Sequence, residues 1–510
     1  MNSINPAISR RGLIALLGQL GTATFIAGGA LPAIAAPADK GRPLRIAVLG
    51  AGIAGLSAAY ELERAGHEAI LLEARDRVGG RNWTLRNGDR ITHLTGADQR
   101  VDFDSGLYLN AGPARIPSHH DHILGYCRDL GVPLEVLVNS SRSAWLGAEK
   151  GRIRQRQAIN DLRGFVSELL EKALASGSLD RELDAATRGK LADFLKGYGD
   201  LGDGFAYRGS QRSGLSRVPG ATWDQTPVGV PPLTLRELLD DPNINMALFE
   251  DNILMQATMF QPVGGMDRVP VALAAALRTP PILNAEIRQI RRRGAGVRIV
   301  WRDRTTGAEH ELIADRAIVT IPLPILVRIP NDFSKSVTRA IASIHYSESV
   351  KTAFQSAPFW ESEQIYGGIS FVGGQTSLVW YPSGSFQKSR QILLAAYTSR
   401  EQGRALAARP RPGQIEIARA AVERLHPGHG RDLTNGVTIN WGEIPFSEGP
   451  WIEWDQDGND RATAAPLDLP DGPFLFAGSH LSPYSGHWQE GGILSTKRAV
   501  ALATSTPVKG

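Results

Sequence analysis

The chain has 510 residues, too many for one hydrophobic core, so two or three domains are expected. Its 42% hydrophobic and 21% charged residues are typical of a globular protein, and a net charge of only +4 gives no reason to expect a nucleic-acid partner. The single cysteine, Cys127, excludes an intramolecular disulfide and any multi-cysteine metal site.

Residues 1–36 predict an export signal. They contain the paired Arg10 and Arg11, no acidic residue, a mildly apolar run and a small-residue end. This pattern is typical of a twin-arginine signal peptide cleaved near Ala35 or Ala36, and the alternative is a membrane anchor. Without this segment the chain carries 54 basic and 52 acidic residues, and we expect a soluble periplasmic or secreted protein. Because the twin-arginine route exports folded proteins, the signal also points to a cofactor acquired before export.

A strand–turn–helix–strand unit follows the signal. Apolar strands at 46–49 and 69–72 flank Gly50-Ala51-Gly52-Ile53-Ala54-Gly55, which begins a helix with apolar spacing. In this pattern the first glycine permits a tight turn, the second lets the backbone approach a pyrophosphate, and the third lets helix and strand pack closely. Glu73 stands 23 residues after Gly50, where a carboxylate accepts hydrogen bonds from a ribose. The unit therefore predicts a dinucleotide site.

The stretch YLNAGPARIPSHH, residues 108–120, holds one arginine, Arg115, between two prolines. A guanidinium on such a restricted backbone fits a bidentate anion, and the alternative is an ordinary surface charge. The histidines that end the stretch are expected to begin a helix, with Ser118 as N-cap and Asp121 at N3, rather than to bind a metal. In that helix Cys127 has the spacing of a buried packing residue.

The middle of the chain carries helical patterns, separated by a Gly/Pro/Ser-rich loop at about 197–232 that is a candidate lid or oligomer contact. Of two later apolar strands, the first contains Lys351 and the second ends in Tyr397. A buried lysine needs a partner or a function, and the alternative is a solvent-facing strand lysine. The acidic, tryptophan-rich segment 445–460 is either a pocket entrance or a surface loop.

Four segments occur in the order of one known family: LEARDRVGGR, VGGMDRVPVALAAAL, ADRAIVTIPLPIL and FLFAGSHLSPYSGHWQEGGILSTKRAV. With them the chain resembles the flavin-containing amine oxidases over nearly all of residues 43–505. One departure is Ser479, which stands where the family usually has an acidic residue after the Phe-Ala-Gly triplet. The resemblance implies an α/β fold with an FAD-binding Rossmann-like domain of the amine oxidase type at 43–114, 255–325 and 462–505, a mixed-sheet substrate domain at 326–461 and a helical cap domain at 116–254.

Within this family the arginine loop resembles that of the L-amino acid oxidases. The resemblance implies that Arg115 and Tyr397 bind a carboxylate, that Lys351 holds a water near the flavin, and that Trp488 walls the substrate site. For Tyr397 and Trp488 the alternative is plain packing, and the direction of His487, where a small residue is common, is left open. The implied FAD-binding residues are Gly50, Gly52, Ile53, Ala54, Gly55, Glu73, Ala74, Arg75, Gly79, Gly80, Arg81, Gly112, Pro113, Ala114, Arg115, Gly478, Ser479 and Trp488.

The resemblance thus predicts an FAD-dependent L-amino acid oxidase that yields 2-oxo acids, ammonia and, with dioxygen, hydrogen peroxide. One alternative is a flavin amine or polyamine oxidase in which Arg115 contacts only FAD. Another is an amino acid dehydrogenase that passes electrons to a quinone, and a third is a flavin-binding protein without turnover. No metal is expected, a homodimer is one expected assembly, and the preferred substrate side chain is not readable from the sequence.

Overall fold

The computed structural model describes residues 42–96, 98–148, 151–217, 220–456, 458–483 and 486–505. The chain divides into two units, and the helices and strands that follow belong to the second, Leu44–Gly510. The export signal predicted for residues 1–36 lies outside the described residues. Among the helices that the structure describes, none combines the length and the apolar character needed to cross a bilayer.

A four-stranded parallel sheet is built from segments far apart in the sequence. Its order is β2 (Glu68–Leu72), β1 (Arg45–Leu49), β16 (Arg316–Val319) and β22 (Phe474–Phe476). Nearly every residue of these short apolar strands is buried, as expected for a parallel sheet covered on both faces.

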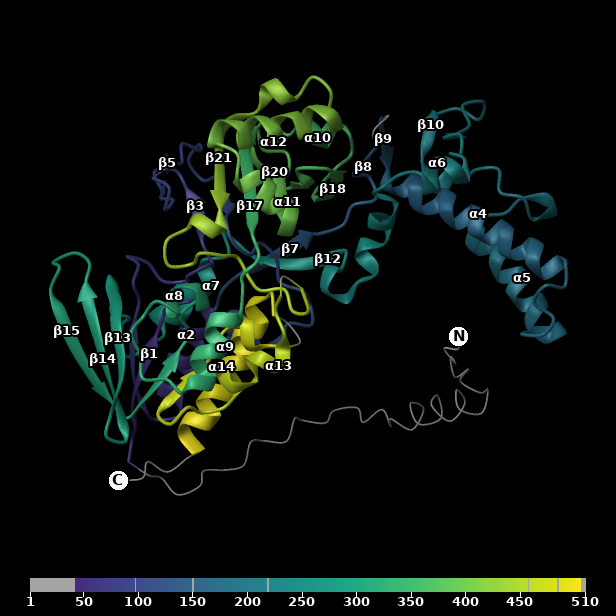
Figure 1. Cartoon of the computed structure of the whole chain (residues 1–510). Helices are drawn as coiled ribbons and strands as arrows, with labels where there is room; N and C mark the ends of the chain where they lie inside the picture. The colour runs from purple at the N-terminus through teal and green to yellow at the C-terminus, as the bar shows by residue number, and fades with distance from the viewer. Residues whose placement is uncertain are drawn as a thin grey trace. The chain divides into compact units, whose positions relative to one another are not determined.

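Alternate side chains of β1 enter two different cores. Ile46 and Val48 pack with the helices α2 (Ile53–Arg64), α3 (Asp121–Asp129), α7 (Arg268–Ala275) and α14 (Gln489–Ser505). Ala47 and Leu49 face the opposite core, which contains the antiparallel strands β13 (Ala285–Arg293), β14 (Gly296–Asp303) and β15 (Glu309–Ala314) and the helices α8 (Leu323–Leu326), α9 (Lys335–Ser343) and α13 (Arg461–Ala464) (Figure 1). The doubly covered sheet confirms the predicted Rossmann-like architecture.

A seven-stranded mixed sheet forms the second part of the fold. Its order is β21 (Thr434–Asn440), β17 (Ser349–Ser356), β20 (Gln391–Ser399), β19 (Ser377–Tyr381), β18 (Gly368–Gly373), β8 (Trp145–Ala148) and β9 (Gly151–Arg154). All pairs are antiparallel except β18 with β8. The sheet carries α10 (Phe359–Ser362), α11 (Arg400–Ala407) and α12 (Arg411–Leu425), and it matches the predicted mixed-sheet architecture.

The range 116–254, predicted as a helical cap, is divided among three parts of the fold. Its helices α5 (Ala185–Gly199) and α6 (Leu235–Leu239) both pack against α4 (Gln155–Ala175). However, α3 packs against α14 and α7, and β8 and β9 extend the mixed sheet. Hydrophobic packing explains the position of α3, because its side chains Ile123 and Cys127 enter the core beside the parallel sheet.

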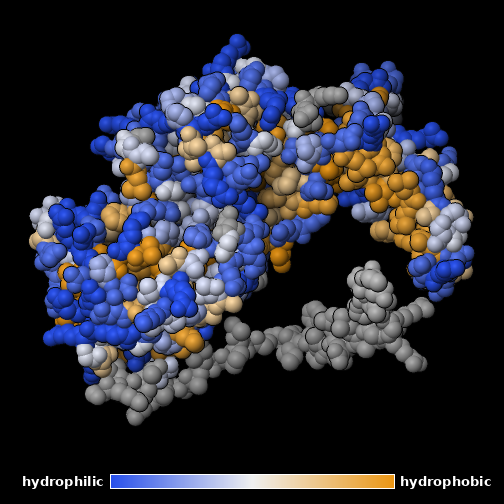
Figure 2. Space-filling model, viewed as in Figure 1, coloured by the Kyte–Doolittle hydropathy of each residue, from blue (hydrophilic) through white to orange (hydrophobic). Residues whose placement is uncertain are grey.

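The stretch predicted as a long loop at 197–232 contains a small hairpin, β10 (Leu215–Arg217) with β11 (Val228–Gly229). It is held to α4 by polar contacts, for example from Ser213 Oγ to Asp161 Oδ1 at 2.7 Å. In the view of Figure 2 the adjoining helices α4 and α5 show hydrophobic side chains at the surface, and Val166, Leu169 and Phe194 are among the exposed ones.

Three further two-stranded ladders occur among the described residues. They are β3 (Thr84–Arg86) with β6 (Tyr108–Asn110), β4 (Arg90–Ile91) with β5 (Gln99–Arg100), and β7 (Leu134–Val138) with β12 (Thr258–Pro262). Ile116 adds to the last ladder: its N–H donates to Phe260 O at 2.7 Å, and the Phe260 N–H donates back at 2.9 Å. The loop that carries Arg115 is thereby tied to a regular strand.

Candidate active site

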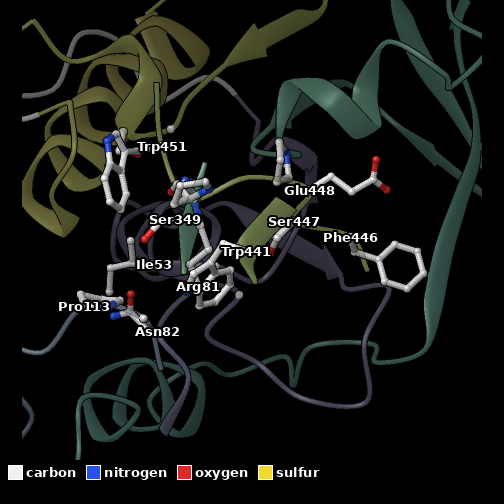
Figure 3. Close-up of a pocket in the computed structure, with 18 of the residues that line it drawn as sticks. Ile53, Arg81, Asn82, Pro113, Ser349, Trp441, Phe446, Ser447, Glu448 and Trp451 are labelled. Carbon is white, nitrogen blue, oxygen red and sulfur yellow. The ribbon is translucent and has the colours of Figure 1, made fainter. Parts of the chain in front are cut away.

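A cavity of about 1150 Å³ lies at the carboxyl end of β1 and extends to β17 and β20. It is larger than the roughly 300–1,000 Å³ of a pocket for one small ligand, which suits a dinucleotide together with a substrate. Figure 3 shows Ile53, Asn82 and Pro113 along one side of this pocket and Phe446 and Glu448 along the other. Every predicted site residue except Gly55 lines it: Gly50, Gly52, Ile53, Ala54, Glu73, Ala74, Arg75, Gly79, Gly80, Arg81, Gly112, Pro113, Ala114, Arg115, Lys351, Tyr397, Gly478, Ser479 and Trp488.

The glycine turn has the geometry that its spacing predicts. Gly50 has a φ of +105°, which only glycine adopts without strain. A Cβ on Gly55 would lie 1.8 Å from Gly50 O, so Gly55 serves helix–strand packing and does not line the cavity. A Cβ on Gly52 would meet no atom within 4 Å. The open space at Gly52 is where a ligand backbone can approach the chain.

The N-terminus of α2 lines the cavity with Gly52, Ile53 and Ala54. The helix begins at Ile53, has no side-chain cap and has no acidic residue in its first turn. Free N–H groups and the helix dipole together favour a phosphate. The site therefore suits the pyrophosphate of a dinucleotide.

Glu73 stands at the end of β2 with its carboxylate fixed. It is 4% exposed, and its oxygens accept hydrogen bonds from Ala51 N at 2.8 Å and from Arg75 N at 2.9 Å. Each carboxylate oxygen has a further lone pair for another donor. Glu73 thus presents a rigid acceptor to the cavity, as the ribose contact requires.

Three cavity-lining side chains carry buried polar atoms without a partner among the described residues. They are Asn82 Nδ2, Ser349 Oγ and both amide atoms of Gln489. Buried polar groups are normally hydrogen-bonded, so these atoms indicate a polar ligand that completes them. They fit a large cofactor such as FAD. None of these three residues was predicted, and only Asn82 had a sequence signal, since it directly follows the Gly79-Gly80-Arg81 turn.

Arg115 is surrounded by aromatic rings. Its guanidinium carbon lies 4.6 Å from the ring centre of Trp380, 5.5 Å from that of Trp488 and 5.9 Å from that of Phe249. Its Nη1 donates to Asn139 Oδ1. Among the described residues no carboxylate forms an ion pair with it. Phe249, Trp380 and Asn139 were not predicted, because no local pattern marks them.

The charge of Arg115 is maintained despite these surroundings. Burial lowers its pKa to about 10, and the nearby Tyr397 opposes the shift. The guanidinium is therefore still cationic at neutral pH. A buried cation without a counter-ion is costly, so the site is prepared for an anionic ligand.

Lys351 is buried in the same cavity, 3% exposed. Its Nζ donates to Asn110 O at 3.2 Å, at the end of β6, and to Gly112 O, on the loop that carries Arg115. Burial and, secondarily, the charge of Arg115 lower the pKa of Lys351 to about 7. The lysine is not solvent-facing, and near neutral pH it exists in both protonation states.

Trp488 and His487 line the cavity side by side. Trp488 lies between Arg115 and His120, whose ring centre is 5.3 Å away in an edge-to-face arrangement. The His487 ring faces Trp451 at 6.3 Å, and its Nε2 is 3.7 Å from Glu453 Oε2. His487 thus lines the cavity together with Trp451 and Glu453.

The acidic segment 445–460 also contributes to the cavity wall. Trp451 and Glu453 line it, and Trp451 Nε1 donates to Glu453 Oε1 at 2.7 Å. By contrast, no described residue of the 197–232 stretch lines the cavity. The first segment therefore belongs to the pocket, whereas the second does not form a lid in this structure.

The predicted cap of α3 was wrong. The N-cap position is His120, and Ser118 instead donates its Oγ to Gln256 Oε1 at 2.9 Å. The first-turn N–H groups of His122 and Ile123 donate to the carboxylate of Glu490, at 3.1 and 3.0 Å. A carboxylate from a distant helix replaces the local serine.

The remaining sequence candidates on α3 are structural. Cys127 is 1% exposed, and burial raises its pKa to about 11, which confirms a packing cysteine. The structure brings no three metal-ligating side chains together within the described residues, the histidines at 119, 120 and 122 included.

Comparison with known proteins extends this picture. The family model for flavin containing amine oxidoreductases matches residues 53–504. An L-amino-acid oxidase of Siganus canaliculatus is 26% identical over 470 residues, covering 89% of this chain and 84% of the relative. A flavin-dependent L-tryptophan oxidase, RebO, of Lentzea aerocolonigenes is 28% identical over 486 residues, covering 89% and 97%.

Solved structures share the fold. Putrescine oxidase bound to putrescine gives a TM-score of 0.59 at 19% identity and covers 90% of this chain and 98% of its own. Cyclohexylamine oxidase from Brevibacterium oxydans IH-35A gives a TM-score of 0.59 at 16% identity and covers 91% and 99%. At these identities the likeness concerns the arrangement of the elements.

Proposed function

The chain belongs to the flavin-containing amine oxidoreductase family, and from this premise we propose that it catalyses the FAD-dependent oxidative deamination of L-amino acids. The products are 2-oxo acids, ammonia and hydrogen peroxide. The observation that carries the proposal is Arg115, a cavity-lining cation that has no carboxylate partner among the described residues. A substrate with a carboxylate supplies the missing counter-ion, whereas a simple amine does not.

The residues that line the cavity have different proposed roles. The glycine turn at Gly50 and Gly52 and the carboxylate of Glu73 would hold FAD, which would supply the acceptor for the hydride equivalent that leaves the carbon bearing the amine. Arg115 binds the substrate carboxylate through its planar fork, and Tyr397 lies beside it as a second donor. The rings of Trp380 and Trp488 exclude water from the guanidinium and confine the substrate.

Lys351 serves a separate step. Its Nζ is held by two backbone carbonyls next to the arginine loop, so its position is fixed relative to Arg115. With a pKa lowered to about 7 by burial, it exchanges a proton near neutral pH. We assign it to holding a water and a positive charge where dioxygen or the imine product reacts.

A second candidate is a flavin oxidase for amines without a carboxylate, favoured by the likeness in fold to putrescine oxidase and cyclohexylamine oxidase. In that case Arg115 contacts only the cofactor. A third is an amino acid dehydrogenase that passes its electrons to a quinone, which suits a periplasmic location. Peroxide formation in the presence and absence of an artificial electron acceptor separates oxidase from dehydrogenase.

The test is a panel of L-amino acids and their decarboxylated amines, with peroxide as readout. We expect amino acids to be oxidised well and the amines poorly. In Arg115→Leu, kcat/KM for the best amino acid should fall by about 100-fold or more, because a charge-assisted bidentate contact is lost. Arg115→Lys keeps the charge without the fork and should recover only part of the loss. Equal oxidation of amines and amino acids, together with an active Arg115→Leu variant, would contradict the proposal.

We further propose export by the twin-arginine machinery, with residues 1–36 as the signal, and action in the periplasm or outside the cell. The paired Arg10 and Arg11 support this. Arg10→Lys combined with Arg11→Lys should leave the precursor inside the cell.

A homodimer is proposed as the assembly, supported by exposed apolar side chains on α4 and α5. Light scattering measures the mass of the assembly.

A further inference from the structure

Asn139 is a buried polar residue next to the site that the proposed mechanism does not use. It is 0% exposed, follows β7 directly, and its Oδ1 accepts a hydrogen bond from Arg115 Nη1. We propose that Asn139 is a positioning residue that sets substrate specificity: it orients Arg115 with an uncharged acceptor and so leaves the guanidinium charge for a substrate carboxylate. This inference rests on the proposed function.

The backbone fixes the two residues relative to each other. Arg115 precedes Ile116, which exchanges hydrogen bonds with Phe260 of β12. Asn139 follows Val138, which is paired with Thr258 of the same β12. The Asn139 N–H donates to Ala257 O at 2.8 Å. Both residues are thus anchored to one strand, and their contact does not depend on a flexible loop.

The orientation of the Asn139 amide is determined by its second contact. Its Nδ2 donates to Met255 O at 3.0 Å. Because the amide nitrogen is engaged there, the oxygen must face Arg115. Leu254 and Met255 line the cavity, so Asn139 also connects the guanidinium to the pocket wall. An aspartate at this position could not donate to Met255 O.

Two of the three guanidinium nitrogens of Arg115, Nε and Nη2, have no hydrogen-bond partner among the described residues. Trp380, Trp488 and Phe249 lie over it at cation–π distances, contacts that ring faces make with a cation without using its N–H groups. Asn139 occupies one N–H of Nη1. The parallel donors of Nε and Nη2 are therefore available for a carboxylate.

Asparagine at position 139 differs from aspartate, which has nearly the same shape, in carrying no charge. In the part of the chain that the structure describes, no acidic side chain forms an ion pair with Arg115. An aspartate at 139 would form a buried ion pair and compete with the substrate carboxylate for the same cation. Asparagine gives the geometric hold without this competition.

The test uses flavin-loaded wild type, Asn139→Asp and Asn139→Leu. Asn160→Asp is the matched control, because Asn160 is also buried and its Nδ2 also donates to backbone, Arg156 O and Arg212 O, away from the cavity. Two readouts are taken: KM and kcat for the best L-amino acid and its decarboxylated amine, and the Kd of benzoate from the flavin absorbance change. Benzoate has a carboxylate and no amine to oxidise, so its Kd reports on carboxylate binding without turnover.

For Asn139→Asp we expect the amino acid KM and the benzoate Kd to rise together by about 30-fold or more, with the amine constants changed by less than about threefold. For Asn139→Leu, which removes the acceptor without adding a charge, we expect about a fivefold rise in both. Asn160→Asp should change neither the amino acid KM nor the benzoate Kd, although it can lower the melting temperature.

Two outcomes overturn the inference. One is an Asn139→Asp enzyme whose benzoate Kd stays at the wild-type value. The other is a loss that is equal for amino acid and amine, which would mark Asn139 as merely structural. If Asn139→Asp does not fold, an unchanged benzoate Kd in Asn139→Leu overturns the inference instead. A wild-type enzyme that oxidises no amino acid and binds no benzoate refutes the proposed function itself, and the inference with it.

Discussion

Lys351 and Tyr397 stand directly opposite each other on the antiparallel strands β17 and β20, with the Lys351 Nζ 4.8 Å from the centre of the Tyr397 ring. Strand register alone therefore places the proposed lysine and the proposed carboxylate-binding tyrosine in one cavity. Arg115 reaches the same place from another segment, and its charge is felt by both side chains.

Lys351→Met should slow the reaction of the reduced enzyme with dioxygen by about tenfold or more, because transfer of electrons to dioxygen builds negative charge that a nearby ammonium stabilises. Burial, followed by the charge of Arg115, lowers the pKa of Lys351 to about 7, so the ammonium is lost as pH rises through that value. The wild-type rate should fall across the same range, and the variant should show no such dependence. Stopped-flow absorbance measures both.

The exposed Lys388 provides the control, since Lys388→Met removes a charge of the same kind outside the cavity. It should behave as wild type. A Lys351→Met enzyme that is reoxidised at the wild-type rate at every pH would show that the lysine is structural.

Gly52→Ala and Gly55→Ala should fail in different ways. A Cβ at Gly52 meets no protein atom within 4 Å, so the variant should fold normally but bind less FAD. A Cβ at Gly55 would lie 1.8 Å from Gly50 O, so this variant should lose about 2–4 kcal/mol of stability. The flavin-to-protein absorbance ratio and the melting temperature of the flavin-free protein separate the two effects. Full flavin content in Gly52→Ala would argue against a pyrophosphate at this turn.

Glu490→Gln should destabilise the fold although it lies outside the catalytic chemistry. The buried carboxylate accepts hydrogen bonds from His122 N and Ile123 N at the start of α3, and an amide cannot serve both donors equally well. We expect a loss of about 1–2 kcal/mol in urea unfolding. Glu311→Gln, which breaks a half-exposed ion pair with Arg298, should cost much less. Equal losses would show that Glu490 does not cap α3.

Glu363 should make the mixed sheet sensitive to acid. Burial alone would raise its pKa, but hydrogen bonds with His426 and Trp145 and the charge of Arg152 lower it to about 2. Since the folded pKa of Glu363 lies below its ordinary value of 4.5, the stabilisation is present above about pH 4.5 and is lost as pH falls toward 2.

Glu363→Gln provides the measurement. The difference in unfolding free energy between wild type and variant should be about 2–3 kcal/mol at pH 6 and should shrink steadily below pH 4. Chemical unfolding at a series of pH values gives this difference. A difference that stays constant down to pH 3 would mean that Glu363 is not held ionised by its neighbours.

Most of the fold could be predicted because its signals are local. The short apolar strand, the glycine turn and the helix at 46–64 each follow from residues within a few positions of one another. The helical cap was less predictable, since the division of 116–254 among three parts depends on which apolar faces meet across the chain. The predicted cap at Ser118 failed for the same reason, because the competing group belongs to α14.

Local residues were sufficient to predict the dinucleotide unit and an arginine on a restricted backbone, because the backbone geometry at Gly50 and the prolines around Arg115 act over short distances. The surroundings of that arginine depend instead on long-range packing. Asn139, Trp380 and Phe249 come from separate segments, and each looks like an ordinary core residue in its own segment. The charge of Arg115 stays available because packing brings an amide and aromatic rings to it, whereas no carboxylate of the described residues forms an ion pair with it. Long-range contacts set this combination, and no local pattern encodes it.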